Sequence, residues 1–185
     1  NDLHDYEDDL KHNRVVKPLV LGLITPKQLR TAISVVTPLA VLVNLFGPLG
    51  LKGGGVYLLG IAFGLAYNFY FKYTPLSPLP YIIAFAALPA SIVLAVEETP
   101  PLWMMAAGSL LGVAAHIANV LKDFDEDGLS GIRSFPRIIG EKASRASIAV
   151  ILVANTVLLN SVSPRPALLI VGIIGALLTF KAPHT

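Results

Sequence analysis

Six apolar runs, each long enough to cross a lipid bilayer as a helix, dominate the sequence. The segments between them, such as FGPLGLKGGG and TPLSPLP, are rich in Gly and Pro and are typical of turns. Gly and Ala recur inside the runs, as close helix packing in lipid requires. We therefore predict an all-α fold, a polytopic transmembrane helical bundle. The predicted spans are residues 28–46, 54–71, 78–96, 101–121, 146–162 and 166–181.

The composition excludes an ordinary soluble domain. Hydrophobic residues make up 54% of the 185 residues and charged residues only 14%. In a typical soluble domain about a quarter of the residues are charged. The net charge of +2 is too small to indicate a nucleic-acid partner. The absence of Cys excludes disulfides and thiolate metal sites. We expect a single transmembrane domain, residues 1–185. It should be incomplete at the N-terminus, because the chain opens on polar residues without Met, and we expect it to be incomplete at the C-terminus as well.

The positive charges indicate the orientation in the membrane. Since successive spans alternate in direction, residues 1–27, the loops 72–77 and 122–145 and the tail fall on one side. Twelve of the fourteen Lys and Arg residues lie on or near that side, and only Lys52 and Arg165 lie opposite. By the positive-inside rule this side is cytoplasmic. We expect a multi-pass protein of the cell membrane whose active site faces the cytoplasm.

Two acidic clusters fall on this same side of the membrane. NDLHDYEDD begins the chain, and NVLKDFDED follows the apolar run 101–121. Helical spacing would place the members of each cluster in one stripe. The stripes comprise Asn1, Asp2, Asp5 and Asp9 in the first cluster and Asn119, Asp123 and Asp127 in the second.

Carboxylates at this spacing repel one another, so two facing stripes need cations between them. Oxygen ligands suit Mg²⁺, which retains open positions for phosphate oxygens. We therefore predict a diphosphate held by carboxylate-bound Mg²⁺; the alternative is solvated loop charge beside lipid headgroups. DFDEDG also looks like the start of a calcium-binding EF-hand loop, but Ser134 stands where the bidentate Glu belongs.

Both acidic motifs resemble signatures of the UbiA-type membrane prenyltransferases. NDLHDYEDD matches NDxxDxxxD, the first aspartate signature of that family, and Asp123 and Asp127 match the second, DxxxD. The segment GLSGIRSFPRIIGEKASR is similar to the cytoplasmic loop that follows the second signature, and Lys17-Pro18 stands where Arg-Pro is usual. The resemblance covers the whole chain.

A third segment, AYNFYFKYTPLSPLPY, is similar to the Tyr/Lys motif of the same family. In strict form that motif places Lys four residues after Tyr, but the step from Tyr67 to Lys72 is five. Asn68 holds the four-step position. The Tyr role is therefore open among Tyr67, Asn68 and Tyr70.

The resemblance implies a nine-helix membrane bundle, of which this chain would carry about seven helices, from the cytoplasmic end of the second to about the eighth. It implies Mg²⁺ as cofactor, a prenyl diphosphate as donor and membrane lipid as surroundings. Diphosphate departs, and a small-molecule or lipid acceptor, commonly an aromatic ring, attacks the allylic carbon. The acceptor stays open among quinone-precursor acids, naphthoates, porphyrin acids, haem precursors and lipid-linked sugars, and so does the prenyl chain length.

The expected site residues follow from the motifs and the resemblance. Metal ligands, directly or through water, are Asn1, Asp5, Asp9, Asn119, Asp123 and Asp127. Catalytic residues are Asp2, Asp5, Asp123 and Lys72. Substrate-binding residues are Arg14, Lys17, Tyr67, Asn68, Lys72, His116 and Lys122.

Some of these residues have a structural alternative. Lys72, Arg14 and Lys122 can instead anchor the chain on the cytoplasmic side. His116, one helical turn before Asn119, can line the acceptor pocket, but a histidine at such a position is more often a hydrogen-bonded residue between helices. Tyr81, near the start of a span, is interpreted as an anchor at the membrane interface.

Two other functions were weighed. A membrane cation transporter should carry acids near mid-membrane or on both sides, whereas only Glu97 and Glu98 lie opposite the two clusters. A CDP-alcohol phosphotransferase should carry DGxxAR before a further aspartate motif, and Asp127-Gly128 is followed instead by LSGIR.

Overall fold

The chain is described by a computed structural model over residues 2–11, 17–122, 124 and 132–181, and within these ranges its regular elements are all helices, without strands. This confirms the all-α prediction. Each predicted apolar run is one long helix in the structure. These helices are α2 (Pro26–Phe46), α3 (Gly50–Phe69), α4 (Leu79–Ala95), α5 (Leu102–Lys122), α8 (Glu141–Val162) and α9 (Pro166–Lys181).

The helix boundaries follow local sequence signals. α2 begins with a capping box, in which the Gln28 backbone N–H donates to Thr25 Oγ1 at 3.2 Å and the Thr25 N–H donates to Gln28 Oε1 at 2.9 Å. Pro26 occupies the first turn, where its missing N–H costs nothing. Gly140, with φ +83°, lets the chain turn between α7 (Phe135–Ile139) and α8.

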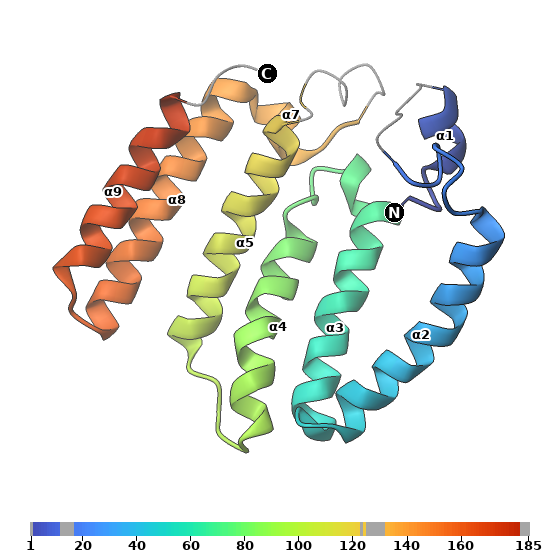
Figure 1. The fold of residues 1–185 in the computed structure, drawn as a ribbon. Helices are drawn as coiled ribbons and strands as arrows, with labels where there is room; N and C mark the ends of the chain where they lie inside the picture. Colours follow the sequence, from blue (N-terminus) through green and yellow to red (C-terminus); the bar gives the residue numbers. More distant parts are fainter. Residues whose placement is uncertain (1, 12–16, 123, 125–131, 182–185) are drawn as a thin grey trace.

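The long helices stand side by side in a curved row and alternate in direction (Figure 1). Each packs against its neighbour in the chain, from α2 through α3, α4 and α5 to α8 and α9. This alternation gathers α1 (Tyr6–Lys11), the 3₁₀ turn η1 (Phe71–Tyr73) and α7 at one end of the bundle, the upper end in Figure 1. The sequence analysis assigned the charges to two sides by assuming that successive helices alternate in direction. The fold has this alternation.

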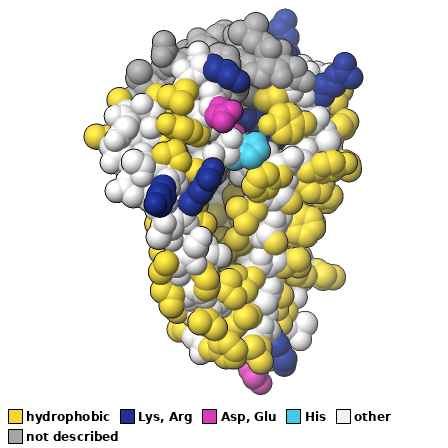
Figure 2. Space-filling view, turned by 90° about the vertical axis from the view of Figure 1, so that its right-hand side faces the viewer, with side chains coloured by type: hydrophobic (Ala, Val, Ile, Leu, Met, Phe, Trp, Pro, Cys, Tyr) yellow, Lys and Arg dark blue, Asp and Glu magenta, His cyan; other side chains and the backbone are white. Residues whose placement is uncertain are grey.

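Three of these helices, α2, α5 and α8, are long and apolar enough to cross a membrane. Leu79–Ala95 and Pro166–Phe180 are apolar but shorter, and α3 carries Lys52 and several glycines. No residue of α2 is buried, and its large apolar side chains point outward. Figure 2 shows hydrophobic side chains over most of the α2 side of the molecule. Such surfaces suit a lipid environment.

α4 and α5 approach each other closely because α5 carries glycine at two positions four residues apart. A Cβ at Gly108 would overlap the backbone oxygen of Phe85, and one at Gly112 would overlap that of Tyr81. Small residues at this spacing let helix backbones come into contact. The close approach brings the upper halves of α4 and α5 together, where His116 lies.

Candidate functional site

The first acidic cluster forms a short helix with a non-helical start. Asp9 lies in α1, whereas Asp2 and Asp5 precede it. The Asp5 carbonyl accepts the Asp9 backbone N–H at 2.8 Å, so that Asp5 stands at the start of the helix. The single helical stripe expected for this cluster is thus only partly formed, because Asp side chains favour turns and caps over helix interiors.

Lys17 joins two of these carboxylates. Its Nζ lies 2.6 Å from Asp9 Oδ2 and 3.4 Å from Asp2 Oδ1. Asp9 is only 2% exposed, and a carboxylate this deeply buried needs a cation. Burial would lower the pKa of Lys17, but the hydrogen bonds and charges of Asp9 and Asp2 outweigh it and raise the pKa above its usual value. Lys17, expected to bind substrate, is here the counter-ion of the acidic cluster.

Asp5 interacts with His4 and Lys72 in addition to Lys17. His4 Nδ1 lies 2.8 Å from Asp5 Oδ1. Burial would raise the pKa of Asp5, but this hydrogen bond and the charges of Lys72, His4 and Lys17 outweigh it, and the pKa falls below its usual value. Lys72, on η1, is therefore close enough to act on Asp5. The structure thus brings together two residues, Asp5 and Lys72, that lie far apart in the sequence.

The N-terminal segment reaches the bundle at the end of α3. The His4 ring meets the Phe69 ring edge-to-face, with centroids 5.0 Å apart. Phe69 is the last residue of α3 and lies directly before the turn that carries Lys72. The acidic cluster is thus placed over the Tyr/Lys motif.

An aromatic cluster lies below that turn, where three helices meet. Tyr67 of α3, Tyr81 of α4 and His116 of α5 pack with ring centroids 4.9–5.6 Å apart. Tyr67 is buried, whereas Tyr70 is 62% exposed and Asn68 is half-buried. Tyr81, interpreted from the sequence as an interface anchor, instead contacts its neighbours inside the bundle, because the α4–α5 approach turns it toward His116.

His116 also makes a buried polar contact that sequence reasoning missed. A hydrogen bond of 2.9 Å joins His116 Nε2 and Ser77 Oγ, and both residues are fully buried. The Phe135 backbone N–H donates to the same Ser77 Oγ at 2.9 Å. His116 is thus hydrogen-bonded between segments. Nothing in the TPLSP turn sequence distinguishes Ser77 from a solvent-exposed turn residue.

The second acidic cluster lies largely outside the described residues, as do Asp123, Asp127, Asn1 and Arg14. Asn119, the described member of its stripe, and the neighbouring Lys122 are exposed at the end of α5. That helix end and α1 lie at the same end of the bundle (Figure 1).

Arg137 connects α7 to Phe124, which lies just beyond the end of α5. Its guanidinium donates to the carbonyl oxygen of Phe124 and lies over the Phe124 ring, 4.5 Å from the centroid. Phe124 comes directly after Asp123, so Arg137 holds the chain beside the second aspartate signature.

Among the described residues no group of three His, Asp or Glu side chains forms a metal site. The donors at the upper end nevertheless suit a hard divalent cation, because Asp2, Asp5 and Asp9 offer only oxygen and Asp9 is buried with a cation already beside it. The chemistry of the first cluster therefore fits Mg²⁺.

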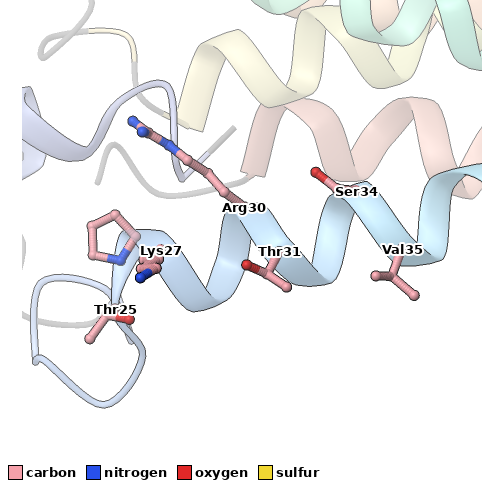
Figure 3. A pocket seen from close by; sticks show the side chains of 7 residues that line it. Thr25, Lys27, Arg30, Thr31, Ser34 and Val35 are labelled. Carbon is pink, nitrogen blue, oxygen red and sulfur yellow. The ribbon is translucent and has the colours of Figure 1, made fainter.

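A cationic groove of about 680 Å³ lies along the first turns of α2 (Figure 3). Lys27, Arg30, Thr31 and Ser34 line it at helical spacing, together with Thr25, Pro26 and Val35. In Figure 3 Arg30 and Ser34 point to one side of α2, and Thr31 and Val35 point to the other. In Figure 2 basic and acidic side chains and a histidine gather around a hollow on this face.

Comparison with known families matches residues 1–183 to the UbiA prenyltransferase family. None of the curated proteins and none of the solved structures compared with the chain matches it. The family match covers nearly the whole chain and agrees with the helical fold and with the aspartate motifs quoted above. The chain belongs to the UbiA prenyltransferase family.

Proposed function

We propose that this membrane prenyltransferase moves an isoprenyl chain from a prenyl diphosphate to an aromatic acceptor, with Mg²⁺ assisting the departure of diphosphate. Family membership supports a membrane prenyltransferase in general. The proposed donor and the role of Mg²⁺ are supported by the carboxylates and lysines that lie together at one end of the bundle. Lys17 contacts Asp9 and Asp2, and Lys72 is close to Asp5. Carboxylates with neighbouring cations are what a metal-bound diphosphate requires.

In this proposal the two aspartate signatures hold the metal. The ligands would be Asn1, Asp5, Asp9, Asn119, Asp123 and Asp127, directly or through water. When bound, Mg²⁺ would neutralise the negative charge that develops on the leaving diphosphate. The first signature supports this role, because its carboxylates are held near one another by Lys17 and lie over the Tyr/Lys motif.

The lysines contribute the remaining positive charge. Lys72 would donate a hydrogen bond to a diphosphate oxygen, since its position near Asp5 places it beside the metal ligands. Lys17 pairs with Asp9 in the structure and would be released toward the diphosphate when another cation takes over the carboxylates. Arg14 and Lys122 are weaker candidates for contacting the diphosphate. Tyr67 and Asn68 of α3 would contact the prenyl diphosphate farther into the bundle than Lys72.

The proposed transfer has two steps. The bond between the allylic carbon and the diphosphate oxygen breaks, and its electron pair leaves with the diphosphate. A ring carbon of the acceptor then bonds to the allylic carbon and loses its proton to a base. We assign that base to Asp2, whose side chain is 48% exposed and whose Oδ1 is 3.4 Å from Lys17 Nζ. The apolar helices would exclude water from the allylic cation.

The orientation is part of the same proposal. The upper end of the bundle carries α1, η1 and α7 and most of the Lys and Arg residues, which by the positive-inside rule would face the cytoplasm of a cell membrane. The first turns of α2, which line the cationic groove, lie at this end as well (Figure 1).

The alternative of a cation transporter finds no support in the described spans. Within α2, α3, α4, α5 and α9 no Asp or Glu is present, and the acid of α8 is Glu141 in its first turn. A path for cations through the bilayer normally carries acids inside the helices.

The test uses membranes that contain the full chain, a labelled prenyl diphosphate, Mg²⁺ and a panel of acceptors. Asp9→Asn and Asp123→Ala should each lower the rate of prenyl transfer by roughly 10²–10³-fold, because the charge on the leaving group loses its stabilisation. Glu98→Gln, an acid at the opposite end of the bundle, is the matched control and should transfer at the wild-type rate. Cation flux without any prenyl transfer would overturn the proposal.

A further inference from the structure

A buried polar link joins three segments that are distant in the sequence. Ser77 lies in the turn before α4, His116 lies on α5, and Phe135 begins α7. Ser77 Oγ is 2.9 Å from His116 Nε2 and accepts the Phe135 N–H, also at 2.9 Å. Ser77 and His116 are both 0% exposed. Water cannot replace these bonds, so breaking one leaves a buried polar group unpaired.

The link is connected to Lys72 through consecutive turns of the backbone. The Thr74 N–H donates to the Phe71 carbonyl at 3.0 Å, and the Ser77 N–H donates to the Thr74 carbonyl at 3.1 Å. Thr74 Oγ1 donates to the same Phe71 carbonyl at 3.1 Å. These bonds wind residues 71–77 into a compact unit, and Lys72 is part of it. The position of Ser77 therefore fixes the position of Lys72.

The other end of this unit is held by the same histidine. Tyr67 lies in the last turns of α3, and its ring packs on the His116 ring, with centroids 5.6 Å apart. His116 thus contacts the chain before η1 through Tyr67 and the chain after η1 through Ser77. Lys72 lies between these two contacts, close to Asp5.

We propose that Ser77 and His116 are positioning residues that hold Lys72 in place for the diphosphate of the prenyl donor. This inference rests on the proposed function, in which Lys72 contacts that diphosphate. Neither residue touches the substrate. They act through the η1 turn, since an ammonium on a flexible side chain contributes fully only when its backbone is fixed.

The primary measurement is the binding of inorganic diphosphate in the presence of Mg²⁺ to the detergent-solubilised full chain, by titration calorimetry. It needs no acceptor and no prenyl transfer. Ser77→Ala should weaken this binding about 10-fold, as the loss of a supporting hydrogen bond does at comparable sites. In the transfer reaction the same variant should raise KM for the prenyl diphosphate by a similar factor and change kcat less.

Two histidine variants separate hydrogen bonding from packing. His116→Gln keeps an amide that can donate or accept near the place of Nε2 and should retain diphosphate affinity close to wild type. His116→Leu keeps apolar bulk without the polar atom and should match Ser77→Ala. Ser77→Cys, which preserves volume but is a weak hydrogen-bonding group, covers the case in which Ser77→Ala does not fold. Equal affinities of the Gln and Leu variants would overturn the proposal.

A double-variant cycle tests whether the effect passes through Lys72. If Ser77 positions Lys72, adding Ser77→Ala to Lys72→Ala should leave diphosphate affinity unchanged. The control is Ser109→Ala. Ser109 Oγ donates to the Ile82 carbonyl at 3.1 Å and links α5 to α4, about two helical turns along α5 from His116. An undiminished effect of Ser77→Ala in the Lys72→Ala background contradicts the inference.

The two proposals fail in different ways. A wild-type chain whose Mg²⁺-diphosphate affinity depends on both Ser77 and Lys72, but which transfers no prenyl group, overturns the proposed function and supports this inference. A chain that transfers prenyl groups equally well with Ser77→Ala and with Ser109→Ala retains the proposed function and overturns the inference.

Discussion

Lys17 Nζ lies 2.6 Å from Asp9 Oδ2, in an ion pair whose carboxylate is almost completely buried. The pair ties the segment after α1 back onto the acidic cluster and supplies the cation that the buried Asp9 needs. An ion pair of this kind holds carboxylates in place while no other cation is bound. We therefore expect the stability of the N-terminal segment to depend on whether a metal ion is bound at the candidate site.

The first prediction concerns this ion pair. Lys17→Met should lower the free energy of unfolding by about 3 kcal/mol, because it removes the lysine ammonium that is ion-paired with the buried Asp9 carboxylate. Added Mg²⁺ should recover more stability in this variant than in wild type, since a second cation replaces the missing one. Thermal unfolding in detergent, with and without Mg²⁺, measures both effects. Lys11→Gln, an exposed lysine of α1, should show neither.

The close approach of α4 and α5 gives the second prediction. Gly112→Ala should lower the free energy of unfolding by about 1–3 kcal/mol, because its Cβ would overlap the Tyr81 backbone and force the helices apart. Gly64→Ala is the matched control in another apolar helix, where a Cβ meets nothing within 4 Å. It should be neutral or stabilising by about 0.5–1 kcal/mol. The measurement is the unfolding midpoint of each variant in the same detergent. Equal midpoints of Gly112→Ala and Gly64→Ala would contradict the close approach of α4 and α5.

The third prediction concerns Arg137. Arg137→Gln should lower the free energy of unfolding by about 2 kcal/mol, since it removes a charged hydrogen bond to the Phe124 carbonyl and the contact with the Phe124 ring. Hydrogen exchange of residues 132–140 should accelerate, because α7 loses its tie to the end of α5. Arg133→Gln removes the same charge from an exposed position and should leave exchange unchanged. Equal exchange in both variants would contradict the assigned contact.

Much of the fold could be predicted from the sequence because the signal is local. Each apolar run became one helix, and Thr25 and Gln28 mark the start of α2 as a capping box should. The alternation of directions follows from the short turns between long helices. The order of helices in the row then needs little more than chain connectivity.

The site was predicted less completely because its contacts are not local. Asp5 and Lys72 were named from motifs, but their proximity depends on His4 packing on Phe69. Ser77 was missed, since a serine in a Pro-rich turn carries no sign that it will meet a helix 39 positions later in the chain. Asp2 and Asp5 were expected on one helical face with Asp9, whereas α1 begins only at Tyr6, so both residues precede the helix.

The last prediction is a pH dependence set by Asp5 and Lys17. The pKa of Asp5 is lowered from its ordinary 3.8, so its contribution to stability is complete above that value and is lost as the pH falls through the folded pKa. The pKa of Lys17 is raised from 10.5, so its contribution is complete below that value and is lost as the pH rises through the folded pKa. Between these two pH values both contributions are complete, so Asp5 and Lys17 cause no change in the stability of the N-terminal segment with pH.

Hydrogen exchange of residues 2–11 across the pH range, corrected for intrinsic rates, measures this dependence. The segment should open below about pH 4, and Asp5→Asn should remove that acid transition, because the amide cannot titrate. Lys17→Met should remove the alkaline transition and leave the acid one. Glu98→Gln, at the other end of the bundle, should preserve both. An acid transition of unchanged midpoint and size in Asp5→Asn would show that another carboxyl group holds the segment against the end of α3.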